Sequence, residues 1–212
     1  MRRFRLTPLR LSAAILIGSL AFAGVSYAAS LGLTSKQLHT WSQALTKGTC
    51  SPAESDAEIR GGNPNRNFGN QSSEKVVNRS NVNDWYVLIG FDPASSPCSL
   101  PATAGADSAV LTLTITSASK NSVSAYPITS PWNAATVTWN TAPTFGSTPD
   151  FTFSGAGTDT FTVTAPLDTG IKSGGSFYGW MLVDTSGTNN ATTTIAGNGS
   201  GQDPAIALHY EK

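Results

Sequence analysis

The feature that most constrains the fold of this chain is an alternation of apolar and polar residues in short runs. In Ala109–Thr116, the side chains of Leu111, Leu113 and Ile115 alternate with threonines. Successive side chains of a β-strand point to opposite faces of a sheet, so this period of two predicts a strand with one buried face. The pattern recurs in three later runs and predicts inward positions for Phe151, Phe153, Phe161, Val163, Ala165, Ile206, Leu208 and Tyr210.

Turn-forming residues separate these runs. The 212 residues include 20 glycines and 12 prolines, and threonine, serine and asparagine are abundant while glutamate, lysine and glutamine are scarce. The segment Trp85–Phe91 is apolar on both faces, which favours a central strand. Many short strands with Gly, Pro and Asn between them predict an all-β sandwich or barrel.

The first 28 residues have the organisation of a signal peptide. Four arginines lie within the first ten residues, an apolar run follows at Leu11–Ala23, and the small residues Ser26 and Ala28 occupy the two positions that a signal peptidase reads. The apolar run is short for a membrane span, which needs about 20 residues. We therefore expect cleavage after Ala28, with Ala23 as the second choice, and secretion to the extracellular space.

The composition after the leader excludes some classes of function. Loss of the four leader arginines leaves nine basic against 13 acidic residues, a net charge of −4, and 12% of the whole chain is charged. Nucleic-acid binding would require a basic face, and no second long apolar run indicates a membrane anchor. The length predicts a single domain, which we expect to be a monomer.

Residues 29–49 do not follow the strand pattern and are interpreted as an N-terminal appendage. Leu38, Trp41 and Leu45 have helical spacing, whereas residues 39–42 also alternate, so helix and strand both stay open. We expect Trp41 to pack against the sandwich rather than to face a ligand. The sandwich itself is expected to span residues 50–212.

Cys50 and Cys98 are the two cysteines of the sequence. In an exported protein, two cysteines indicate a disulfide, and closing a loop of about 48 residues would contribute roughly 4 kcal/mol on a chain-entropy estimate. A reactive or metal-binding pair has no support, because neither a CxxC motif nor a neighbouring histidine accompanies them. The prediction is a structural Cys50–Cys98 disulfide.

Two tryptophans flank the segment Pro131–Pro143, PWNAATVTWNTAP. Alternation over Thr136–Trp139 predicts a strand with Val137 and Trp139 on one face. Trp85 also lies in a strand pattern, and we expect both Trp85 and Trp139 in the core. Sugars stack on exposed flat rings, and the rings expected to be partly exposed are Trp132, Tyr126 and Tyr178.

Short motifs in a fixed order carry a resemblance to a known family. They are Asp56-Ala57, Asn67-Phe68-Gly69, Gly90-Phe91-Asp92, Ser108-Ala109-Val110-Leu111, Trp132, Thr138-Trp139-Asn140 with Pro143, Gly179-Trp180 and Pro204-Ala205. With these motifs, Ser55–Lys212 resembles DNRLRE-domain proteins, which are related to the carbohydrate-binding part of disaggregatase-like proteins and to an alginate-binding module. The resemblance implies a jelly-roll-like antiparallel β-sandwich that is usually non-catalytic and is often appended to secreted polysaccharide-active enzymes.

Two positions depart from that family. Gly90 stands where relatives commonly have arginine, and Ala134 stands where they commonly have an acidic residue. Any ligand contact that these two side chains make in relatives is missing here. The resemblance therefore predicts the scaffold better than the sugar.

The three arginines outside the leader, Arg60, Arg66 and Arg79, lie within one segment that also contains Lys75. Arginine is suited to bidentate capture of a uronate carboxylate. We therefore predict a cationic rim that binds an acidic polysaccharide. The alternative is that these residues are solvated surface charges or structural ion pairs.

A calcium site is a further hypothesis. Asp56 and Glu58 would share one face of a strand, and with carbonyl oxygens or Asp203 they would suit a calcium ion. The family resemblance adds that structural calcium is common in such sandwiches. No other cofactor is expected.

No catalytic constellation is recognisable in the sequence. His39 and His209 are not accompanied by a GxSxG motif, and the 13 acidic residues are mostly scattered singly. We expect a secreted, non-catalytic carbohydrate-binding protein that recognises a polysaccharide or cell-surface glycan on a surface platform. The alternatives are a structural or adhesive extracellular protein without glycan affinity and, third, a polysaccharide lyase or glycosidase.

Overall fold

The computed structural model describes residues 46–79, 83–173, 177–186 and 190–212, and all structural statements concern this part of the chain. The predicted signal peptide and residues 29–45 of the appendage, with His39 and Trp41, lie outside it. Every strand pairing in the described residues is antiparallel, which confirms the predicted all-β sandwich. Among the same residues, no helix is long and apolar enough to cross a bilayer.

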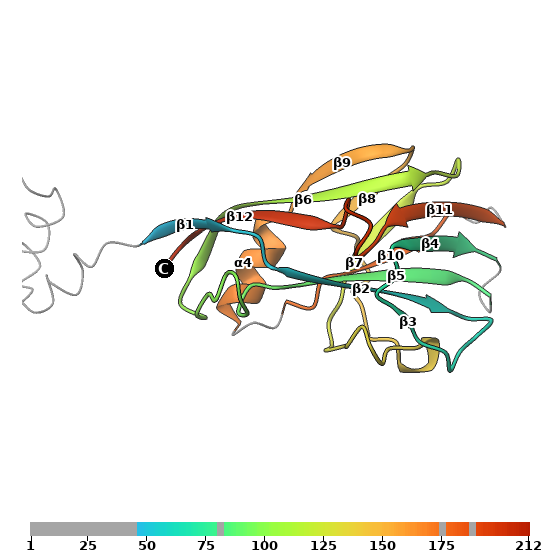
Figure 1. The fold of residues 1–212 in the computed structure, drawn as a ribbon, viewed down its shortest axis with the longest axis horizontal. Coiled ribbons are helices and arrows are strands. Elements are labelled where there is room, and N and C mark those ends of the chain that lie inside the picture. Colours follow the sequence, from blue (N-terminus) through green and yellow to red (C-terminus); the bar gives the residue numbers. More distant parts are fainter. Residues whose placement is uncertain (1–45, 80–82, 174–176, 187–189) are drawn as a thin grey trace, which may run out of the picture. The chain divides into compact units, whose positions relative to one another are not determined.

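The strands form two layers (Figure 1). The elements are β1 (Lys47–Cys50), β2 (Ala53–Arg60), β3 (Phe68–Gly69), β4 (Ser73–Asn78), β5 (Trp85–Asp92), β6 (Gly105–Ser117), β7 (Val123–Pro127), η1 (Trp139–Thr141), β8 (Phe151–Phe153), β9 (Gly157–Thr162), α4 (Thr164–Lys172), β10 (Trp180–Asp184), β11 (Ala191–Ala196) and β12 (Ala205–Glu211).

One layer follows the order β3–β2–β5–β10–β7–β8. In the other layer, β6 pairs with β9 along one edge. Along its other edge, the first part of β6 pairs with β12 and its last part pairs with β11. Strand β12 then pairs with β1, and β11 pairs with β4. A single pairing between Val77 of β4 and Trp85 of β5 joins the layers. The layers are therefore held together mainly by side chains.

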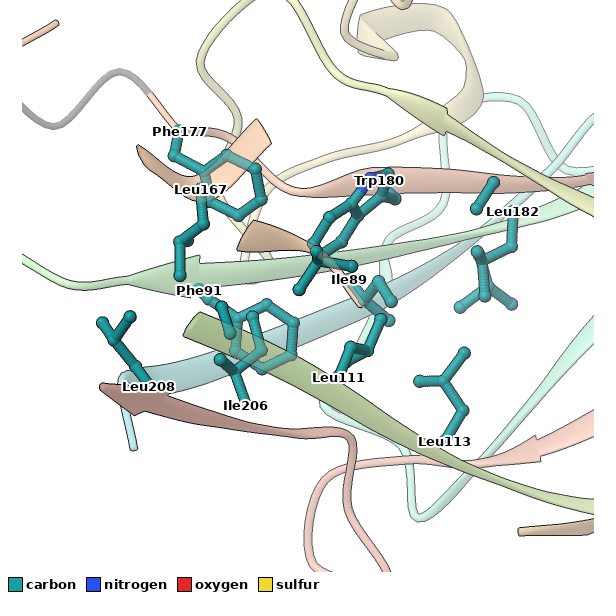
Figure 2. Packing of buried hydrophobic residues seen from close by; sticks show 14 of the residues in the cluster. Ile89, Phe91, Leu111, Leu113, Leu167, Phe177, Trp180, Leu182, Ile206 and Leu208 are labelled. Carbon is teal, nitrogen blue, oxygen red and sulfur yellow. The ribbon is translucent and has the colours of Figure 1, made fainter. Parts of the chain in front are cut away.

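The main core lies between the two layers. Leu111, Leu113 and Ile115 of β6 are buried there, as their alternation predicts. Ile89 and Trp180 of the other layer belong to the same cluster, and Figure 2 shows Leu111 and Leu113 on the side of the core that faces them. Burial of each such side chain contributes roughly 1.5–3 kcal/mol, so the alternating side chains of β6 contribute directly to the stability of the sandwich.

The strand β5 is apolar on both faces because it contacts two clusters. Val87 and Ile89 face the main core, while Leu88 faces a second cluster on the outer side of the same layer. This outer cluster consists of Ala57, Ile59, Leu88, Ile128, Ala134, Val137, Met181 and Val183. Part of it comes from the connection between β7 and β8, which therefore covers the outer face of the layer.

That connection contains the Pro131–Pro143 segment, and the strand predicted over Thr136–Trp139 is wrong. The N–H of Val137 donates to the carbonyl of Asn133 (2.9 Å), a local turn, and Trp139 begins the 3-10 helix η1. The Asn67 side chain donates to the carbonyls of Ala134 and Val137 at 2.8 and 2.7 Å. These backbone groups are satisfied without a partner strand, so the alternation in this segment forms no sheet.

The prediction for Phe161, Val163 and Ala165 is also partly wrong. Phe161 lies in β9 and Val163 is buried, but Ala165 is exposed in the first turn of α4. Pro166 follows, and proline is tolerated in the first turn of a helix because its missing N–H has no intrahelical partner there. The helix buries Leu167 and Ile171 in the main core.

The predicted disulfide between Cys50 and Cys98 is confirmed, with the two Cα atoms 5.4 Å apart. It joins the end of β1 to the connection that follows β5. Strand β1 pairs with β12 from Lys47 onward, so the last residues of the predicted appendage belong to the sandwich.

Candidate functional site

Three arginines and two aromatic rings form one continuous cluster at the end of the first layer. The Arg60 Cζ atom lies 3.9 Å from the centroid of the Phe68 ring and 4.0 Å from that of Trp85. Arg66 lies over Phe68 at 4.9 Å, and Arg79 over Trp85 at 5.1 Å. We call these five residues the arginine–aromatic cluster; each guanidinium contacts a ring within the range of a cation–π interaction.

The strand register builds this cluster from separate parts of the sequence. Arg60 is the last residue of β2 and stands opposite Trp85, the first residue of β5. Phe68 in β3 pairs with Glu58 of β2, which places its ring beside Arg60. Side chains in such pairs lie close enough to interact directly. The short hairpins around β2 therefore gather residues that are separated along the chain.

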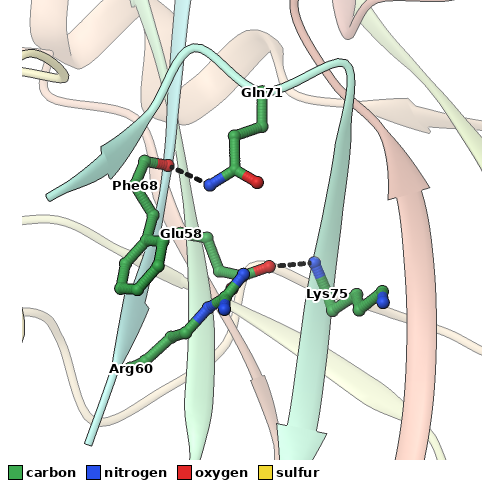
Figure 3. Close-up of polar contacts among 5 residues, drawn as sticks. All are labelled: Glu58, Arg60, Phe68, Gln71 and Lys75. Carbon is green, nitrogen blue, oxygen red and sulfur yellow. Dashed lines mark hydrogen bonds and ion pairs between the residues drawn. The ribbon is translucent and has the colours of Figure 1, made fainter. Parts of the chain in front are cut away.

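A buried carboxylate anchors Arg60. The Nε atom of Arg60 forms an ion pair with Glu58, and the other Glu58 oxygen accepts the backbone N–H of Lys75 at 2.7 Å. Burial raises the pKa of Glu58, while Arg60 and the Lys75 N–H oppose that rise. Figure 3 shows the Arg60 guanidinium between Glu58 and the Phe68 ring. Both oxygens of Glu58 are thus engaged.

Lys75 is not part of the cluster. Its side chain is exposed and extends away from Arg60 (Figure 3). Arg66 and Arg79 are exposed as well, whereas the Arg60 side chain is only 22% exposed. The structure therefore brings together three of the four predicted cationic residues.

Trp85 is not the core residue that its strand pattern predicts. It is half-buried, and neither hydrophobic cluster of the described residues includes it. Its position at the end of β5 explains the difference, because Arg60 and Arg79, and not apolar side chains, lie over the ring there. Trp139 is also half-buried and lies against Tyr86 of the outer face, with ring centroids 5.0 Å apart.

The rings predicted to be partly exposed lie elsewhere. Trp132, Tyr126 and Tyr178 are all half-buried against the outer cluster, and the Trp132 indole N–H donates to the Tyr178 carbonyl at 2.8 Å. Trp132 and Tyr178 line a surface pocket near Ser55 and Gly90, which form a pair between β2 and β5. That pair is five residues along the strands from Arg60 and Trp85, about 17 Å. These rings do not join the arginine–aromatic cluster.

Gly90 lets Trp132 approach this sheet. A Cβ atom at Gly90 would lie 3.0 Å from Cζ2 of Trp132 and 3.1 Å from Oγ of Ser55. The indole thus occupies the space that the side chain of a larger residue at position 90 would need. An arginine, common at this position in the family that the sequence resembles, would require Trp132 to move.

Four acidic side chains lie together at the edge between the layers. Glu54, Asp56 and Glu58 alternate along β2 and face the same way, and Glu74 of β4 lies near them. Burial is the main cause that raises the pKa of Glu54 to about 8 and that of Asp56 to about 6, with repulsion from neighbouring carboxylates adding to both. The pKa of Glu74 is raised well above its usual value, again mainly by burial.

The residues of the calcium hypothesis lie within or beside this acidic group, and the charge of Asp203 helps to raise the pKa of Glu54 and Asp56. Asp56 is fully buried, Glu58 is engaged by Arg60, and the exposed Asp203 accepts the N–H and O–H of Ser200 at 2.9 and 3.0 Å. As the side chains lie, no three His, Cys, Asp or Glu residues of the described part form a ready metal site.

Four residues of these two regions escaped sequence reasoning. Phe68 and Trp85 become partners of the arginines only through strand pairing. Glu54 continues the alternation of Asp56 and Glu58, and Glu74 precedes the core residue Val76 by two positions. That last spacing was a usable signal, because residues two apart in a strand share a face.

Comparison with known proteins supports a carbohydrate-binding role for this scaffold. The model of carbohydrate-binding module family 96 matches residues 48–210. No curated protein matched the chain. The carbohydrate-binding part of the sequence-based expectation agrees with this match, while the DNRLRE name stays a prediction. Since the match spans almost the whole sandwich, the chain belongs to carbohydrate-binding module family 96.

Proposed function

We propose that this protein is a secreted, non-catalytic module that binds an acidic polysaccharide at the arginine–aromatic cluster. The observation that carries the proposal is the convergence of Arg60, Arg66 and Arg79 on the rings of Phe68 and Trp85. These are the three arginines that follow the leader, in a chain with more acidic than basic residues after it. Such a concentration supports a dedicated anion-binding surface.

The chemistry of the cluster favours carboxylates. A guanidinium stacked on a ring keeps its plane fixed while its edge can donate two parallel hydrogen bonds to a uronate carboxylate. Arg66 and Arg79 are exposed and are the proposed ligand-binding residues, whereas Arg60 is anchored by Glu58 and positions both rings. The Phe68 ring is 7% exposed, so guanidinium–carboxylate pairs, and not ring stacking, supply the main contacts.

Affinity electrophoresis through gels that contain alginate tests this function. We expect the protein to be retarded by alginate but not by the neutral polymer laminarin, and the retardation to weaken at high salt because exposed charges are screened. The double substitution Arg66→Ala/Arg79→Ala should abolish it. Lys75→Ala/Lys120→Ala is the matched control, since it removes the same charge outside the cluster.

Two outcomes would contradict the proposal. One is equal mobility with and without each of several acidic polysaccharides. The other is an alginate response that the two double variants lose to the same extent, which would indicate binding through net charge alone. Release of oligosaccharides from the polymer during these assays would contradict the non-catalytic part.

A structural or adhesive role is the second candidate, and one observation favours it. Threonines of β6 and β9 stand in register on the outward face, with Thr112 opposite Thr160 and Thr114 opposite Thr158. The Oγ1 atoms of Thr114 and Thr158 are 3.5 Å apart. Sedimentation velocity across a range of concentrations distinguishes the two, because self-association without glycan retention would support this candidate.

A further inference from the structure

Three buried carboxylate oxygens have no hydrogen-bond partner within the described residues: Oε1 of Glu54, Oδ1 of Asp56 and Oε1 of Glu74. Asp56 is fully buried and Glu74 is 1% exposed. None of the three residues is in an ion pair in this part of the chain, since the nearby Arg60 pairs with Glu58. An ionised carboxylate that is buried without a partner is strongly unfavourable. Without a cation, burial therefore favours the neutral form of Glu54 and Glu74, and a cation bound between these carboxylates would stabilise their charged form.

Several chain segments converge on these carboxylates. A Cβ atom at Gly197 would lie 2.2 Å from the Gln71 carbonyl oxygen, 2.8 Å from Oδ2 of Asp56 and 3.2 Å from Cγ of Glu74. The backbone N–H of Asn198 donates to Oδ2 of Asp56 at 2.6 Å. Its side-chain amide donates to Oε2 of Glu54 at 3.4 Å. Glycine at position 197 thus leaves room for oxygen atoms of Asp56 in β2 and of Gln71 before β4, and for the Glu74 side chain of β4.

We propose that Glu54, Asp56 and Glu74 bind one calcium ion at the edge between the two layers, with the Gln71 carbonyl as a further oxygen ligand. The donor set contains only oxygen, which suits calcium, whereas zinc prefers histidine and cysteine ligands. Calcium also accepts irregular arrangements of six to eight oxygens, while magnesium demands a near-ideal octahedron. Binding requires Glu54 and Glu74 to change rotamer, so that their carboxylates turn toward Asp56.

The ion would act on the structure by joining β2 to β4. These strands come from different layers, which are joined by one backbone pairing in the described residues. The proposal does not depend on glycan binding, because none of the three carboxylates belongs to the arginine–aromatic cluster. It also differs from the sequence-based hypothesis, in which Glu58 and Asp203 were ligands.

Thermal unfolding with and without calcium tests the site. The purified protein is treated with EDTA, dialysed, and titrated with CaCl2 while Tm is followed by circular dichroism. At a calcium concentration about 100-fold above Kd, we expect Tm to rise by about 5–10 °C. Equal MgCl2 should raise it less. Equilibrium dialysis should give one calcium ion per chain.

Substitutions assign the ion to these residues. Glu74→Gln should remove the calcium response and, without calcium, raise Tm, because glutamine does not have to take up a proton in order to be buried, as the glutamate does. Asp107→Asn, which changes an exposed carboxylate on β6, should keep the full response. Glu54→Gln serves as the second variant if Glu74→Gln does not fold. Absence of a calcium-dependent shift in the parent protein, or a full response in the folded glutamine variant, would overturn the proposal.

Discussion

Arg60 and Trp85 form the end pair of strands β2 and β5, and the Arg60 guanidinium lies 4.0 Å from the Trp85 ring centroid. The same guanidinium pairs with the buried Glu58 and lies over Phe68. One side chain therefore links a buried carboxylate to the surface on which Arg66 and Arg79 stack. This linkage makes Arg60 a structural residue of the proposed binding surface.

Replacing Arg60 with alanine should destabilise the protein. The change leaves Glu58, which is fully buried, without its positive partner, and we expect a loss of about 2–3 kcal/mol in the free energy of unfolding, below the usual cost for fully buried pairs because Arg60 is partly exposed. Urea unfolding at pH 7 measures it. Adding Glu58→Gln to Arg60→Ala should recover part of the loss. No recovery in this double-mutant cycle would mean that the two side chains are not energetically coupled.

Arginine geometry, and not charge alone, should determine the affinity of the proposed surface. The double substitution Arg66→Lys/Arg79→Lys keeps both charges but removes the planar guanidinium groups that stack on Phe68 and Trp85. We expect alginate binding to weaken by about tenfold, equivalent to about 1.4 kcal/mol. Isothermal titration calorimetry with alginate oligosaccharides gives the affinity. Wild-type affinity in the lysine variant would show that simple charge is sufficient.

Gly170→Ala should destabilise the sandwich although alanine favours helices. A Cβ atom at this position of α4 would lie 2.2 Å from Cβ of Phe177, so the helix or the core residue Phe177 must move. The cost of overpacking, about 1–3 kcal/mol, should exceed the gain in helix propensity, about 1 kcal/mol at most. Thermal denaturation gives the Tm of Gly170→Ala and of the control variant Thr169→Ala, which changes an exposed residue of the same helix. Equal Tm values for the two variants would contradict this close contact.

The stability that Asp168 contributes should be lost in acid. Lys172, at 2.6 Å, and the Ala106 N–H, at 2.9 Å, lower the pKa of this carboxyl despite some opposing burial. A group whose pKa is lower in the folded state stabilises the fold above its unfolded pKa, and this contribution disappears as pH falls through the folded pKa. At pH 7, we expect the free energy of unfolding of the wild-type protein to exceed that of the Asp168→Asn variant by about 1 kcal/mol.

Urea unfolding of both proteins between pH 7 and pH 2.5 tests this pH dependence. The difference between them should be constant down to about pH 5 and should shrink below the ordinary aspartate value of 3.8. A difference that stays constant through this acid range would show that Asp168 does not titrate differently in the folded and unfolded states.

Local patterns predicted a large part of the fold. Alternation located β6, β8 and β12, and the two-sided apolar run located β5, because a strand's side chains report directly which faces are covered. The same reasoning was wrong at Thr136–Trp139 and at Ala165. A run of four to six residues satisfies a strand pattern by itself, but it forms a strand only where another strand offers backbone partners. The first segment closes local turns, and the second continues into α4.

The candidate sites divide in the same way. The sequence alone showed that the arginines lie in one segment and predicted that Asp56 and Glu58 share a strand face, because both inferences need only short-range spacing. Strand pairing and the meeting of the two layers then placed Phe68 and Trp85 under the arginines and Glu74 beside Asp56. Those contacts depend on the register between distant segments, which is set by packing of the whole sandwich. The spacing within β4 could show only that Glu74 shares a face with Val76, and not that Asp56 lies beside it.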